Sequence, residues 1–177
     1  MPNDGPKPLP ELDEETIAFA QRVFQHARAG QVRELGDLLR QGLPPNLRNE
    51  KGDSLLMLAS YHGHADVVRL LMEHGADPEL ANDRGQTPLA GAAFKGDLAT
   101  VQSLLEGGAD VNGRQEGGKT PLMVAAMFNR TEIVDVLLAR GADIEACDAG
   151  GLTAEALASA MGAIDTAAQL AAAGQAP

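Results

Sequence analysis

Glycine recurs with a 33-residue period in two separate columns of this chain. Leucine, valine and alanine recur with the same period in two further columns. A period of this length is typical of a solenoid, in which each unit buries its apolar face only by stacking on its neighbours. The glycine columns are Gly42, Gly75, Gly108, Gly141, Gly174 and Gly52, Gly85, Gly118, Gly151; the apolar columns are Leu38, Leu71, Leu104, Leu137, Leu170 and Leu35, Val68, Val101, Val134, Ala167.

Each period predicts two helices and a connecting loop, as the segment 85–117 illustrates. Thr87 is a good N-cap, and Pro88 suits the first helical position because that residue needs no N–H there. Gly96 predicts a turn into a second helix with apolar residues at helical spacing. Gly108 is expected to end that helix in the left-handed conformation. A hairpin-like connection then leads to the next unit.

The motif TPL followed by two alanines, and the later motif LLxxGAD, resemble the ankyrin repeat. The second motif stands at Leu71–Asp77, Leu104–Asp110 and Leu137–Asp143. The resemblance covers residues 19–177 and implies an all-α ankyrin-repeat solenoid of about five helix-turn-helix repeats with hairpin-like connecting loops. The expected organisation is a disordered tail over 1–11 and an ankyrin-repeat domain over 12–177, with repeats at about 19–51 (capping), 52–84, 85–117, 118–150 and 151–177 (capping).

The two ends depart from the repeat pattern as capping units should. Asp13 can cap a longer first helix that runs to about Arg28. Its apolar residues are expected to shield the first inner face from water, and the last repeat thins its apolar columns to alanine. These shielding residues are Ile17, Phe19, Val23 and Phe24.

The chain also lacks the histidine that usually follows TPL in the family. Methionine or alanine stands there instead, so the hydrogen bonds that this histidine would make between repeats are absent. We therefore expect looser coupling between repeats, offset in part by methionine filling space. The positions are Met57, Ala90, Met123 and Ala156.

The resemblance implies that a protein partner binds the concave face, formed by the first helix of each repeat and the loop tips. Outside the capping helix the chain has three aromatic residues, and all fall on this face. They either bind a partner or merely pack on the adjacent helix; binding is favoured because the core columns contain no ring. The expected partner-binding residues are Tyr61, His62, Phe94, Lys95, Met127, Phe128 and Met161 on the helices, and Lys51, Asp53, Asp83, Arg84, Gln86, Glu116 and Lys119 at the tips.

Charge and composition narrow the class of partner. A formal net charge of −11 argues against nucleic acid, whose binding needs lysine and arginine to displace counterions. The concave segments are nearly neutral, which suits a protein partner. A single cysteine and the lack of a long apolar run or leader-like start favour a cytoplasmic monomer without a membrane contact. Abundant alanine, glycine, proline and arginine suit a bacterial source.

Two other functions remain open at this stage. The chain could be an inhibitory or accessory subunit of an enzyme, toxin-neutralising or redox-associated, that makes contact through its acidic surface. It could also be a hydrolase or metal carrier, since His62 and His64 stand close together in the sequence. No convergent metal-ligand set, activated nucleophile or phosphate-binding loop supports that reading. We expect a non-enzyme that needs no cofactor and no metal.

Overall fold

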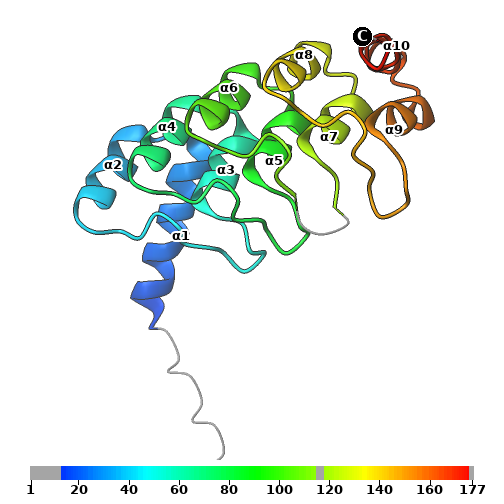
Figure 1. Cartoon of the computed structure of the whole chain (residues 1–177). Coiled ribbons are helices and arrows are strands. Elements are labelled where there is room, and N and C mark those ends of the chain that lie inside the picture. The colour runs from blue at the N-terminus through cyan, green and yellow to red at the C-terminus, as the bar shows by residue number, and fades with distance from the viewer. Residues whose placement is uncertain (1–12, 115–117, 176–177) are drawn as a thin grey trace, which may run out of the picture.

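Paired antiparallel helices repeat along the whole of the computed structural model, which describes residues 13–114 and 118–175. The inner row of helices stacks side by side, the outer row packs behind it, and the loops project together from one side (Figure 1). The inner helices are α1 (Glu14–Ala29), α3 (Leu55–His62), α5 (Pro88–Lys95), α7 (Pro121–Met127) and α9 (Ala154–Met161). The outer helices are α2 (Val32–Arg40), α4 (Ala65–Glu73), α6 (Leu98–Glu106), α8 (Thr131–Ala139) and α10 (Ile164–Ala173).

The described residues contain no β-strand beyond one isolated bridge between Arg48 and Ser54. This confirms the predicted all-α solenoid of helix-turn-helix repeats. The predicted tail over 1–11 lies outside the described residues, as do Glu116 and its two neighbours.

The inner helices begin and end as the repeat pattern predicts. At the N-caps of α3, α5, α7 and α9 a hydroxyl accepts a hydrogen bond from the backbone N–H three residues later, at 3.0–3.3 Å, and Asp13 caps α1 in the same way at 2.7 Å. At the other end a glycine in the left-handed conformation turns the chain toward the outer helix; Asn129, with φ of 55°, takes that role after α7. The caps are Ser54, Thr87, Thr120 and Thr153.

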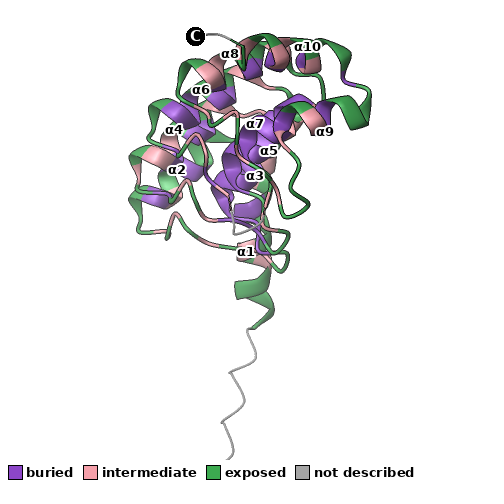
Figure 2. Cartoon of the chain, turned by 45° about the vertical axis from the view of Figure 1, so that its right-hand side comes forward, coloured by how far each residue is buried: buried purple, intermediate pink, exposed green. Residues whose placement is uncertain are grey.

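The core lies between the two rows and is built from aliphatic side chains. The leucines at 71, 104, 137 and 170 are all fully buried, as the 33-residue column predicts, whereas Leu38 in the first repeat is only partly buried. Paired alanines on α5 and α7 are also fully buried, and their small side chains let neighbouring inner helices approach closely. Figure 2 shows this buried surface running along the inner row.

The first helix corrects one expectation. Val23 and Phe24 are buried, but Ile17 and Phe19 are 43% and 40% exposed and shield nothing. The reason is length: α1 has 16 residues and spans about 24 Å, whereas the eight residues of α3 span about 12 Å. The N-terminal half of α1 therefore extends past its neighbours into solvent (Figure 2).

Hydrogen bonds between loops connect successive repeats. A side-chain oxygen of Asn46, Glu79 or Asn112 accepts the backbone N–H located 31 residues later, at 2.8 Å in each case. The position usually held by histidine is filled by buried methionine at Met57 and Met123. Hydrogen bonds between repeats are thus made at other positions, in the loops and also between outer helices, where Arg69 donates to Ser103 and Gln169 donates to the carbonyl oxygen of Thr131.

Of these three acceptors Glu79 is the charged one, and replacing it with glutamine should stabilise the protein slightly. Partial burial, and then the nearby Asp110 and Asp77 carboxylates, raise the pKa of Glu79. Ionisation is therefore less favourable in the folded state than in the unfolded state. A glutamine side chain would keep the acceptor without the charge, so we expect a gain of about a few tenths of a kcal/mol, limited by solvent screening.

The gain from Glu79→Gln should be present at neutral pH and disappear as the pH falls and Glu79 takes up its proton. Urea denaturation of both proteins across this pH range measures it. An equal or larger gain in acid would contradict the assignment.

Candidate functional site

Three aromatic rings form a continuous row on the exposed side of the inner helices. Tyr61 at the end of α3 stacks on Phe94 at the end of α5, with ring centroids 5.7 Å apart and planes 13° apart. Phe128, which follows α7, meets Phe94 edge-on at 4.7 Å. Tyr61 is 42% exposed and Phe128 is 38% exposed, with Phe94 half-buried between them. We call these three residues the aromatic row.

The other predicted helix positions flank the aromatic row. His62 and Lys95 are exposed, Met127 is half-buried, and Met161 on α9 is 54% exposed. The His62 ring lies edge-on to Tyr61 at 5.5 Å. Partial burial lowers the pKa of His62, and the nearby positive charges of His64, Lys95 and Arg28 lower it further. This end of the face therefore has a positive local potential.

A groove of about 390 Å³ lies beside the aromatic row, between α3, α5 and the two loops before them. Tyr61, His62 and Phe94 line it on the helix side, and Lys51, Arg84 and Gln86 line it on the loop side. Arg28, Met57 and Gly91 complete part of its wall, although the sequence analysis did not include them among the binding residues. We call this space the N-terminal groove.

The repeat period itself indicates that Arg28 belongs to the concave face. It stands one repeat period before Tyr61, which stands one period before Phe94, so the column that carries the rings begins on the capping helix. Because the capping helix lacks the TPL motif, that motif does not place Arg28 in the column. The same step predicts that α1 contributes to the concave face.

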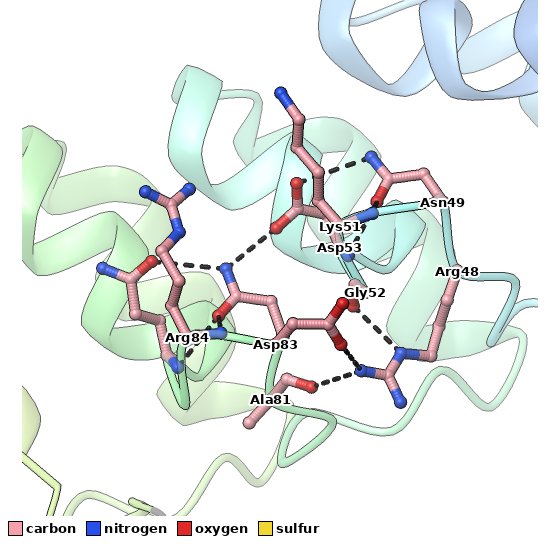
Figure 3. A network of polar contacts seen from close by, with 10 residues as sticks. Arg48, Asn49, Lys51, Gly52, Asp53, Ala81, Asp83 and Arg84 are labelled. Carbon is pink, nitrogen blue, oxygen red and sulfur yellow. Dashed lines mark hydrogen bonds and ion pairs between the residues drawn. The ribbon is translucent and has the colours of Figure 1, made fainter.

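Asp53 corrects the prediction of partner contacts at the loop tips. Its side chain is only 9% exposed and accepts hydrogen bonds from the side-chain amides of Asn82 at 2.8 Å and Asn49 at 3.4 Å. The bond from Asn82 joins two neighbouring loops, whereas the bond from Asn49 lies within one loop (Figure 3). A carboxylate held in this way is a structural link between neighbouring loops, and both of its oxygens are already occupied by side-chain amides.

The remaining tip residues differ in what they contact. Asp83 pairs with Arg48 at 3.3 Å, and Lys119 pairs with Asp148 at 3.2 Å. Gln86 is exposed and accepts a hydrogen bond from Asn82 at 3.2 Å. Figure 3 shows the side chains of Lys51 and Arg84 rising on the same side of this network, with no bond drawn from their charged ends. Glu116 lies outside the described residues.

Two histidines, one of them from the pair that suggested a metal site, have structural contacts. His64 Nε2 lies 2.8 Å from the carbonyl oxygen of Arg28, and His74 Nδ1 lies 2.9 Å from that of Leu70. Within residues 13–114 and 118–175, no three side chains of His, Cys, Asp or Glu gather as metal ligands. No helix in that part of the chain is both long and apolar enough to cross a bilayer.

Comparisons with known proteins agree with the repeat geometry. The family model for ankyrin repeats in three copies matches residues 23–115 and again 91–177. A Pseudomonas aeruginosa protein named as an ankyrin repeat protein is 68% identical over 63 residues. That alignment spans 36% of this chain and 37% of the relative, so the likeness covers little more than a third of the relative's length. The repeat period, the stacked helix pairs and the match over most of the chain show that it belongs to the ankyrin-repeat family, whose repeats are general protein–protein interaction modules.

Proposed function

We propose that this protein binds a protein partner through its concave face and loop tips, and catalyses no reaction on that partner. The observation that carries the proposal is the aromatic row. Three rings from successive repeats meet at 5.7 and 4.7 Å, and two of them remain more than a third exposed. Large apolar groups placed together at a surface are typical of a binding site.

The arrangement suits binding energetically. The rings already contact one another, so a partner that covers them would immobilise few side chains on association. Truncating an aromatic anchor at the centre of an interface commonly costs about 2 kcal/mol. His62, Lys95 and Gln86 surround the row with polar groups that remain exposed. An apolar centre within a polar rim is the usual anatomy of a protein interface.

The double change Phe94→Ala and Phe128→Ala should abolish capture of the partner. We expect a loss of about 100-fold in affinity, since each truncated anchor is worth about 1 to 2 kcal/mol. The measurement is affinity purification from lysate of the native host with mass spectrometry, followed by titration of the captured partner. Circular dichroism and thermal melting of the variant establish that the array still folds.

A matched control is the double change Ile17→Ala and Phe19→Ala. It also removes exposed apolar side chains, but from the free half of α1. Capture should survive it. If the ring variant folds and captures the same partner as the parent chain, the concave face is not the binding site. If high salt abolishes capture and the ring variant still captures the partner, binding belongs to the acidic surface.

A further inference from the structure

Three cationic side chains converge on the N-terminal groove from three different elements. Arg28 comes from α1, Lys51 from the loop before α3, and Arg84 from the loop before α5. None of the three has an ion pair within the described residues. Four other basic residues, at positions 40, 48, 69 and 119, are each paired with an aspartate. The groove therefore holds positive charge that the described part of the protein leaves uncompensated.

The groove offers hydrogen-bond donors and little negative charge. Asp53 is the only carboxylate among the described lining residues, and the amides of Asn82 and Asn49 already occupy it. His62 adds a further ring nitrogen beside Tyr61. Its pKa, lowered by burial and by neighbouring cations, is consistent with a positive potential at this place. A bound carboxylate would reverse that effect and favour the charged imidazole.

The opposite wall of the groove is apolar. Tyr61, Phe94, Met57 and Leu58 lie along α3 and α5, and Gly91 packs so closely on the Met57 sulfur that a side chain there would crowd it. A ligand in this space meets cations on one side and rings on the other. An extended peptide fits this division, because its successive side chains point to opposite sides.

The charge of the chain as a whole selects between anionic partners. A net charge of −11 repels the continuous phosphate backbone of a nucleic acid, whose binding needs many cations along its path. Three cations in one groove suit a short run of carboxylates.

We infer that the N-terminal groove binds an extended acidic segment of a protein partner, with its carboxylates on Arg28, Lys51 and Arg84 and an apolar side chain against Tyr61 and Phe94. The inference rests on the proposed function and specifies the chemistry of the partner at that face. It assigns the ionic part of recognition to the first two repeats, with Arg28 on the capping helix and Lys51 and Arg84 on the loops.

The test is selection of random linear peptides displayed on phage against the whole chain. We expect the enriched peptides to carry several Asp or Glu residues and at least one aromatic or large aliphatic residue. The triple change Arg28→Gln, Lys51→Gln and Arg84→Gln should weaken the binding of a selected peptide about 30-fold, or about threefold for each cation. The matched control Arg22→Gln, Arg33→Gln and Arg140→Gln removes the same charge elsewhere and should leave affinity within about twofold.

The outcomes separate the inference from the proposed function. Peptides that lose binding with Tyr61→Ala and Phe94→Ala but show no acidic enrichment would overturn the inference and leave the concave face as the binding site. If both triple variants weaken peptide binding equally, the loss follows from the net charge of the protein and not from the groove, and the inference is overturned as well. If a thymidine oligonucleotide binds the groove as tightly as the selected peptides, the anion is phosphate and the inference is wrong. If no selected peptide loses binding when Tyr61 and Phe94 are replaced with alanine, the result contradicts the proposed function itself.

Discussion

Replacing Leu104 with alanine should lower the free energy of unfolding by about 3 to 4 kcal/mol, the cost of truncating a fully buried leucine in a core with little room to collapse. Leu104 is 0% exposed in α6, which packs between α4 and α8 and against α5. Because each repeat is stabilised by its neighbours, this loss in a central repeat should weaken the whole array. Chemical denaturation followed by far-UV circular dichroism measures the change.

Leu170→Ala provides the comparison for this effect. Leu170 is also 0% exposed and belongs to the same 33-residue column, but α10 is the last described helix and packs mainly against α9, α8 and α7. We expect a smaller loss and a partial transition confined to the last repeat. Equal losses with a single transition in both variants would contradict nearest-neighbour stacking as the source of stability.

The change Asn82→Asp should lower the free energy of unfolding by about 3 kcal/mol at neutral pH. This is the usual cost of a buried charged group that lacks a hydrogen-bond partner. Asn82 is 3% exposed; its oxygen accepts the backbone N–H groups of Arg84 and Gln86, and its amide donates to Asp53 at 2.8 Å. Aspartate would keep the two acceptor bonds, as Asp148 does in the last loop. The amide nitrogen that donates to Asp53, however, would become a carboxylate oxygen. Two carboxylates would then face each other in a buried place, where they repel and water solvates neither of them.

The loss caused by Asn82→Asp should shrink as the pH falls, because one proton shared between the two carboxyl groups restores a hydrogen bond. Thermal melting of the variant and the parent chain at neutral and acidic pH measures it. Asn112→Asp is the control: its oxygen accepts a backbone N–H, and Glu79 shows that a carboxylate serves there. A control loss as large as that of Asn82→Asp would show that charge alone, and not the buried contact, is responsible.

The repeat pattern predicted the backbone of this protein better than its side-chain contacts. Thr87, Pro88 and Gly96 determine where α5 begins and ends through local chemistry that a single sequence reveals. The leucine and valine columns predict burial because every repeat presents the same face to its neighbours. Such features need no knowledge of the distance between repeats.

Contacts between repeats were harder to predict. Asp53 stands at a loop tip in the sequence, yet Asn82 from the next loop helps to bury it, and that pairing depends on how closely the loops stack. Phe19 is an apolar residue of the first helix, but whether another helix packs against it depends on how far the neighbouring α3 extends. The same period places Tyr61 and Phe94 one repeat apart; whether their rings touch follows from the spacing of inner helices that only the structure provides.

Hydrogen–deuterium exchange of this protein with and without its captured partner tests the central claim most directly. We predict that slowed exchange appears at the ends of α3, α5 and α7 that carry the aromatic row and in the loops around Lys51 and Arg84. Protection confined to the outer helices α2, α4, α6 and α8, with no change on the concave face, would contradict it.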